Sequence, residues 1–160
     1  MGIIIRRIEE RDNRSIADVI KNVCREFKVD WPGTVYTDPT TNDLYRLFQN
    51  PGSAYWIAEE DGRLVGGCGI YPTDGLPANY AELVKFYLLP GSRGKGIGKK
   101  LMAKCFISAI ASGYEHLYLK SIPEFDKALE MYEKAGFKQL ESALGHSVDL
   151  VCNIWMVKPL

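Results

Sequence analysis

The 160-residue sequence lacks both a long hydrophobic run and an excess of charge of either sign. No apolar stretch approaches the roughly 20 residues that a membrane-spanning helix needs, and the apolar run after Met1 is too short for a signal peptide. The 20 basic and 20 acidic residues cancel, which argues against a nucleic-acid-binding surface. We therefore expect a soluble, cytoplasmic protein that has neither a membrane nor a nucleic acid as a partner.

Cysteine and histidine are scarce as well. The four cysteines and two histidines are Cys24, Cys68, Cys105, Cys152, His116 and His146. The cysteines are widely spaced and form no C-x-x-C pair, so neither a zinc site nor a disulfide framework is expected. We predict that no metal is bound, that the compartment is reducing, and that both histidines are structural or exposed.

The residues that are present have the composition of an ordinary globular protein, with 46% hydrophobic residues. A chain of this length can bury a core of its own. No internal repeat, low-complexity tract or linker divides it, and we predict a single domain over residues 1–160.

The periodicity of apolar residues predicts the order β-α-α-β-β-β-α-β-α-β-β. Strands are expected at residues 3–8, 54–60, 63–71, 83–89, 115–120, 137–140 and 150–157, and helices at about 13–27, 42–50, 97–111 and 125–134. Asp61-Gly62 between two extended runs predicts a β-hairpin with a type I′ turn. This order is typical of a mixed α/β sheet with helices on both faces.

The chain is organised around residues 81–111. A strand closed by Pro90 is followed by residues 91–98, where four of eight positions are glycine, and then by a helix. The first turn of a helix has unpaired N–H groups and a partial positive charge, so it attracts an anion. Four basic residues add charge at the same place, namely Arg93, Lys95, Lys99 and Lys100. The stretch therefore predicts a phosphate-binding loop.

Two motifs narrow the choice of phosphate-containing ligand. The glycine spacing fits neither a dinucleotide-binding motif nor a P-loop. The run Arg93-Gly94-Lys95-Gly96-Ile97-Gly98 instead resembles the R/Q-x-x-G-x-G/A signature of the GNAT superfamily of N-acetyltransferases. Residues 128–137, ALEMYEKAGF, are similar to the A-x-x-x-Y-x-x-x-G-F pattern of many bacterial members. The predicted order of elements also matches this superfamily over essentially the whole chain.

The resemblance implies a GNAT-like fold, a central mixed and mostly antiparallel sheet with a splay between the strands at 82–89 and 115–120. Acetyl-CoA would be the cosubstrate and would lie in this splay, without a metal. Backbone groups of Phe86, Tyr87 and Leu88 would contact its pantetheine arm, and an N–H near Phe86 or Tyr87 would face the thioester carbonyl. The pyrophosphate would be held at Arg93, Gly94, Lys95, Gly96, Ile97, Gly98 and Lys99, with Lys127 in reach of a phosphate.

The same resemblance suggests two catalytic residues. Tyr132 would give its proton to the departing thiolate, although it shares a helix stripe with Phe125 and Leu129 and could be a core residue instead. Glu82 would draw a proton from the substrate ammonium, or it could be a strand-end ion-pair partner of Lys85.

Two positions depart from the family's pattern. Phe125 stands where many members place an asparagine that contacts pantetheine. Lys120 lies near the position of a glutamate in members that acetylate the N-termini of ribosomal proteins. That substrate class therefore loses support.

The resemblance implies transfer to a primary amine of a small molecule, an amino acid or a peptide by direct attack on the thioester. Two alternatives stay open: a non-catalytic acetyl-CoA-binding module, and a transferase of a longer acyl group. Many relatives dimerise, and the sequence leaves a homodimer open.

Three segments are expected to recognise the acceptor: residues 28–41, 72–80 and 141–149. The aromatic residues that suggest a pocket for a small amine, an amino acid or a peptide end are Trp31, Tyr36 and Tyr80. The loop that carries the first two could pack as a lid or line the pocket.

Overall fold

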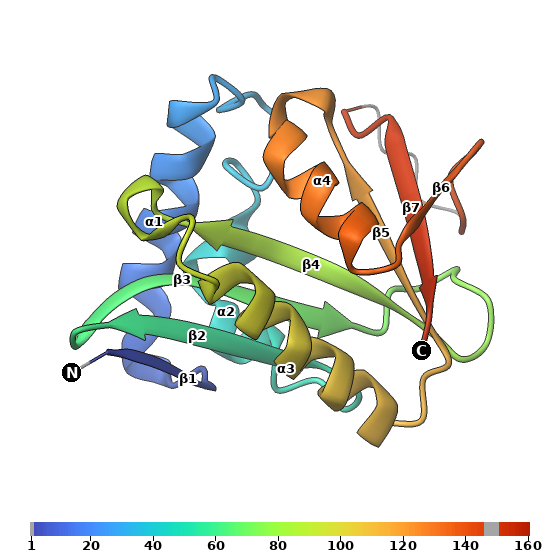
Figure 1. Cartoon of the computed structure of the whole chain (residues 1–160), viewed down its shortest axis with the longest axis horizontal. Coiled ribbons are helices and arrows are strands. Elements are labelled where there is room, and N and C mark those ends of the chain that lie inside the picture. Colours follow the sequence, from blue (N-terminus) through green and yellow to red (C-terminus); the bar gives the residue numbers. More distant parts are fainter. Residues whose placement is uncertain (1, 146–150) are drawn as a thin grey trace.

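The computed structural model describes residues 2–145 and 151–160. At its centre lies a seven-stranded sheet in the order β1-β2-β3-β4-β5-β7-β6 (Figure 1). The strands are β1 (Ile3–Arg7), β2 (Ala54–Glu60), β3 (Arg63–Tyr71), β4 (Tyr80–Leu88), β5 (His116–Ser121), β6 (Lys138–Leu140) and β7 (Ile154–Pro159). Neighbouring strands are antiparallel except β4 and β5, which are parallel. The predicted mixed, mostly antiparallel sheet is therefore confirmed.

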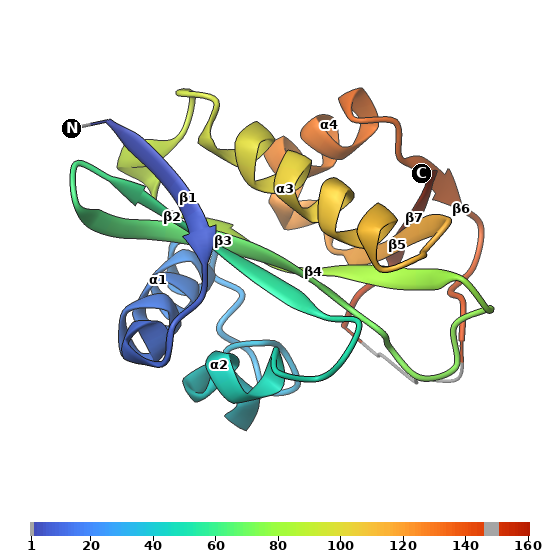
Figure 2. The same ribbon diagram turned by 90° about the horizontal axis from the view of Figure 1, so that it is seen from below.

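Helices cover both faces of this sheet. They are α1 (Asn13–Glu26), α2 (Leu44–Leu47), α3 (Ile97–Ala111) and α4 (Asp126–Lys134). Figure 2 shows α1 and α2 on one face and α3 and α4 on the other. Each face has its own apolar cluster, because α1 buries Ile16 and Ile20 on one side while α3 buries Leu101 and Cys105 on the other. No helix in the described ranges is both long enough and apolar enough to cross a membrane.

Three elements differ from the prediction by more than one residue at an end. α2 is a single turn rather than a helix over 42–50, because Pro39–Asn42 forms a separate 3₁₀ helix and Asp43, with φ −143°, interrupts the two. β4 begins at Tyr80 rather than at residue 83, because its first residues pair with β5. β7 runs over Ile154–Pro159 rather than over residues 150–157, since residues 151–153 are not part of the strand, and residue 150 lies outside the described residues.

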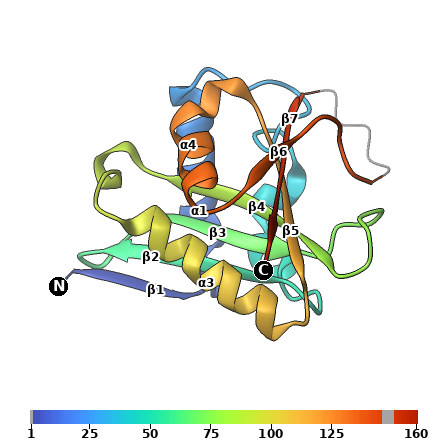
Figure 3. The same cartoon turned by 45° about the vertical axis from the view of Figure 1, so that its right-hand side comes forward.

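The splay between β4 and β5 is confirmed. The two strands pair only from Tyr80 to Glu82, opposite His116 to Tyr118. β5 then continues along β7 as far as Ser121, and Figures 1 and 3 show it diverging from β4. In the later half of β4, one backbone edge therefore faces the gap and does not pair with β5.

A bulge in β4 lies at the opening of the splay. Lys85 has a positive φ of 52°, and the register against β3 shifts between Gly67 and Gly69. The Tyr55 hydroxyl stabilises the bulge by donating a 2.8 Å hydrogen bond to the Lys85 carbonyl. A Cβ atom at Gly67 would lie 2.4 Å from the Tyr55 ring. The β3 glycines therefore permit close packing against the bulge.

Candidate active site

A cavity of about 1380 Å³ opens where β4 and β5 separate. Its walls come from β4, the end of β5, the glycine-rich loop before α3, α4, and the end of α1 with the loop that follows it. These segments are distant in sequence, and the sheet brings them together. The cavity occupies the splay in which the resemblance places acetyl-CoA.

The glycine-rich loop closes one end of the cavity. Gly94 and Gly96 have φ of 77° and 81°, in the left-handed region that favours glycine. The first N–H to donate into α3 is that of Lys100, to the Gly96 carbonyl at 3.1 Å. Within the described ranges, no N–H group of residues 94–99 has an acceptor. A run of free N–H groups at a helix start fits a pyrophosphate.

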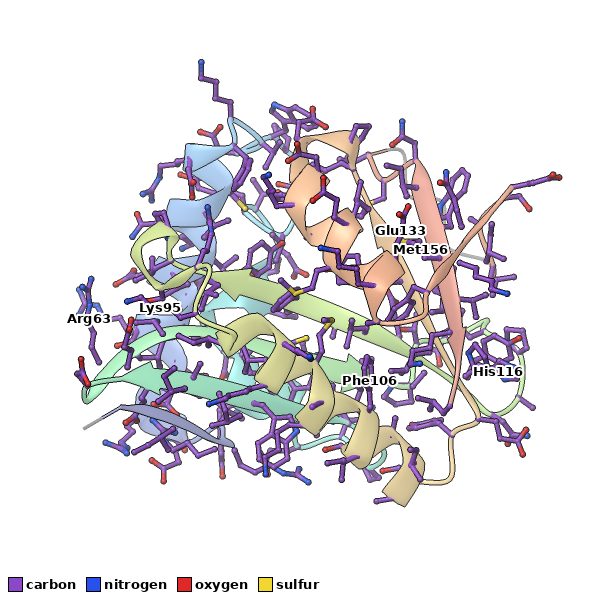
Figure 4. The ribbon with its side chains drawn as sticks, viewed as in Figure 1. Arg63, Lys95, Phe106, His116, Glu133 and Met156 are labelled. Carbon is purple, nitrogen blue, oxygen red and sulfur yellow. The ribbon has the colours of Figure 1, made fainter. Side chains whose placement is uncertain are left out.

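Two basic side chains of this loop form ion pairs, and only one of them borders the cavity. The Arg93 guanidinium donates two hydrogen bonds to the Glu26 carboxylate, at 2.7 and 2.8 Å, and two more to the Leu88 carbonyl. The Lys95 ammonium donates to Glu60 at 2.6 Å, and Figure 4 shows Lys95 beside the β2–β3 hairpin, at the opposite end of the molecule from His116. Arg93 still borders the cavity, whereas Lys95 does not.

The other predicted cofactor contacts lie along the cavity. Its lining includes Phe86, Tyr87, Leu88, Ile97, Gly98, Lys99 and Lys127. A Cβ at Gly98 would lie 2.9 Å from Phe86 Cζ and 3.2 Å from Met131 Sδ. Glycine therefore lets α3 approach β4 and α4 closely at this point.

Tyr132 lies on α4 and lines the cavity. It is 8% exposed, and its ring packs between those of Phe86 and Phe137, with centroids 6.0 and 5.8 Å away. Burial, with a smaller effect of Cys68, raises its pKa above the ordinary value of a phenol. The hydroxyl is therefore protonated throughout the neutral range.

Glu82 is the other candidate catalytic residue, and it lines the same cavity from β4. Its side chain is buried, with the residue 6% exposed. The Thr73 hydroxyl donates a 2.7 Å hydrogen bond to Glu82 Oε1. Glu82 comes from a strand and Tyr132 from a helix, 50 residues apart in sequence. The fold thus brings the two candidates to one cavity.

The predicted aromatic pocket residues lie elsewhere. Trp31 is 40% exposed, the Tyr36 hydroxyl accepts a 3.4 Å hydrogen bond from Arg25, and the Tyr80 ring stacks on His116 at 4.5 Å. None of the three lines the cavity in the described part of the chain, although other residues of the same loop do, among them Val35 and Asp38. His146, and the predicted acceptor segment 141–149 from residue 146 onward, lie outside the described residues.

Lys85 and Lys120 are among the cavity residues that were not assigned to the site from the sequence. Lys85 lines the cavity from the bulge of β4, and Lys120 from β5. A signal was present for the first, since Lys85 is the only charged residue in the otherwise apolar run 83–89. Across residues 2–145 and 151–160, no three His, Cys, Asp or Glu side chains gather as a metal site would require.

Comparison with known families defines the class of protein. The sequence matches the acetyltransferase (GNAT) family over residues 20–137. The chain therefore belongs to the GNAT family of acetyltransferases. As a member it is an N-acetyltransferase.

Individual relatives agree with this assignment. The chain is 36% identical over 158 residues to the uncharacterized N-acetyltransferase YjgM of Escherichia coli K12, covering 98% of this chain and 95% of that protein. A GNAT-family acetyltransferase from Staphylococcus aureus Mu50 has a TM-score of 0.86 at 21% identity, over 99% of both chains. The PaiA N-acetyltransferase of Thermoplasma acidophilum, solved with coenzyme A, has a TM-score of 0.78 at 23% identity, over 100% of both chains. Both solved structures therefore have the same fold as this chain.

Proposed function

We propose that this protein transfers the acetyl group of acetyl-CoA to a primary amine of a small molecule, an amino acid or a peptide. We also propose that residues 1–160 work as one N-acetyltransferase domain, since strands from Ile3 to Pro159 belong to one sheet. The observation that carries the proposal is the cavity in the splay. It has free N–H groups at the glycine-rich loop, and both Glu82 and Tyr132 line it.

Each part of the cavity has a role in this proposal. Acetyl-CoA, when bound, supplies the thioester whose C–S bond breaks as the amine nitrogen forms a C–N bond to the carbonyl carbon. The N–H groups of residues 94–99 hold the pyrophosphate. An N–H near Phe86 or Tyr87, on the edge of β4 that β5 has left, stabilises the charge that develops on the carbonyl oxygen, an effect of roughly 3 kcal/mol.

The two candidate catalytic side chains handle protons. Glu82 accepts the proton of the substrate ammonium, directly or through a water molecule. Tyr132 donates its phenolic proton to the sulfur of the departing coenzyme A. Because burial raises the pKa of Tyr132, the phenol carries its proton at neutral pH and is available as a donor.

A panel of amines assayed for thiol release from acetyl-CoA tests this function. We expect release that depends on the amine and that yields the acetylated amine by mass spectrometry. The same panel with longer acyl-CoAs tests whether acetyl is the preferred group. Tight coenzyme A binding without transfer to any amine would contradict the proposal.

A further inference from the structure

Four charged side chains meet at the end of the cavity away from the glycine-rich loop. Glu82 and Lys85 come from β4, Lys120 from β5, and Asp38 from the segment between α1 and α2, and all four line the cavity. Glu82 marks the base of the splay, where pairing with β5 ends. The loop that fits the pyrophosphate follows the other end of β4. The charged end is therefore the part of the cavity that the proposed transfer leaves for an acceptor.

The β4 bulge determines the direction of Lys85. Residues three apart on a regular strand lie on opposite faces, so Glu82 and Lys85 would point to different sides of the sheet. The positive φ of Lys85 breaks this alternation. Its ammonium then lies 3.6 Å from Asp38 Oδ2. Both Glu82 and Lys85 line the cavity.

The Lys85 side chain is largely enclosed and its ammonium is loosely paired. Its side chain is 14% exposed, and its 3.6 Å separation from Asp38 exceeds the distance of an N–H···O hydrogen bond. Burial lowers the pKa of Lys85, and the nearby carboxylates of Asp38 and Glu82 oppose that effect. A second cation, Lys120, is close enough to add to the lowering. A buried cation in this position would be stabilised by a further carboxylate.

We propose that Lys85, together with Lys120, binds a free carboxylate of the acceptor, and that the acceptor is an α-amino acid. This inference rests on the proposed acetyl transfer to an amine. An α-amino acid carries its amine one carbon away from its carboxylate. With the carboxylate at Lys85, the amine lies on the side of Glu82, two intervening residues back on the same strand.

Matched acceptors test the proposal. Each amino acid in a panel of L-amino acids is compared with its primary amide and with the amine that remains after removal of the carboxylate. We expect kcat/KM for the amino acid to exceed that of both neutral analogues by about tenfold or more, the size of one charge-assisted hydrogen bond. Equal values for all three would overturn the inference while leaving acetyl transfer intact, and no transfer to any acceptor would overturn both.

Variants of Lys85 and Lys120 test whether these residues cause the preference for an acceptor with a free carboxylate. Lys85→Gln should raise KM for the amino acid about tenfold or more and leave KM for the amide nearly unchanged. Lys120→Gln should act in the same direction, and Lys85→Arg should restore part of the preference because it keeps the charge. Lys138→Gln, an exposed lysine on β6, is the matched control.

Folding and cofactor binding are followed in parallel by thermal unfolding with and without coenzyme A. A Lys85→Gln protein that folds and raises KM equally for acid and amide would contradict the carboxylate assignment. If that variant does not fold, the same comparison with Lys120→Gln and Lys85→Arg decides the question. Retention of the full preference for the acid in Lys120→Gln would then overturn the proposal.

Discussion

Tyr132 occupies an environment that is apolar on two sides and open to the cavity on another. The rings of Phe86 and Phe137 contact it, and burial raises its pKa. A core tyrosine would have the same neighbours, so packing alone does not distinguish a structural role from a catalytic one. The distinction requires a change that removes the hydroxyl and keeps the ring.

Tyr132→Phe is that change. We expect turnover to fall at least about tenfold, because the departing sulfur loses its proton donor, while the affinity for coenzyme A changes little. Turnover is measured by thiol release and affinity by calorimetry. Tyr45→Phe, on α2 and outside the cavity lining, is the control. Unchanged turnover in Tyr132→Phe would assign the residue to the core.

Glu82 is tested through the pH dependence of the reaction. A general base must be deprotonated, so kcat/KM of the natural protein should fall at acidic pH. In Glu82→Gln this acidic limb should move or disappear, with a lower plateau. Glu133→Gln, which changes an exposed glutamate on α4 (Figure 4), should keep the original profile. An acidic limb that stays in place in Glu82→Gln would exclude this residue as the base.

At the scale of elements, the cavity depends on contacts that hold β4 and the glycine-rich loop in place. Arg93 links α1 to the end of β4, because its guanidinium bonds both Glu26 and the Leu88 carbonyl. On the neighbouring strand, Gly67 leaves room for the Tyr55 ring, whose hydroxyl bonds the bulge. Gly67 and Arg93 thus shape the site, although neither is a candidate catalytic residue.

Gly67→Ala should disturb this arrangement. Its new Cβ would lie 2.4 Å from the buried Tyr55 ring, and such overpacking costs about 1–3 kcal/mol. We expect a lower free energy of unfolding by that amount, measured with urea, and a lower kcat/KM because the bulge shifts. Gly91→Ala is the control, since its Cβ would meet nothing within 4 Å. Equal stability of both variants would show that the bulge tolerates a displaced Tyr55.

At the scale of the whole molecule, the cavity exists because a parallel pair of strands stops pairing after three residues. α1 and its following loop close one side, and α4 closes another. A ligand that spans the cavity therefore contacts elements from both halves of the chain. Its binding should stabilise the fold as a unit, since it binds the native state and not the unfolded chain.

Acetyl-CoA should accordingly raise the melting temperature in a concentration-dependent way. A ligand at 100 times its dissociation constant adds about 2.7 kcal/mol to the free energy of unfolding. Pantetheine lacks the pyrophosphate that we assign to residues 94–99, so it should give a smaller shift in differential scanning calorimetry. Equal shifts at equal concentration would place the binding energy outside the glycine-rich loop.

Structural features that depend on residues close together in the sequence were predictable from it. Asp61-Gly62 predicts the type I′ turn, and both residues have the required positive φ, 51° and 81°. The apolar stripe of α1 and the glycines before α3 likewise predict a helix and an anion-binding loop. The fold class follows from the order of such elements, and family membership follows from two local motifs.

The direction of individual side chains at the site was not predictable in this way. Lys85 points into the cavity because β4 bulges against β3, and Arg93 pairs with Glu26 across 67 residues of sequence. Tyr80 stacks on His116 rather than lining the pocket, because β4 and β5 are in register there.

By itself, then, the sequence determined the order of the elements, the family and the glycine-rich loop before a helix, because hydrogen bonding and apolar periodicity act over a few residues. Only the tertiary structure decided which charges meet at the end of the cavity away from that loop. The pairing of distant strands sets which faces meet, and one bulged residue is enough to turn a lysine from one side of a sheet to the other.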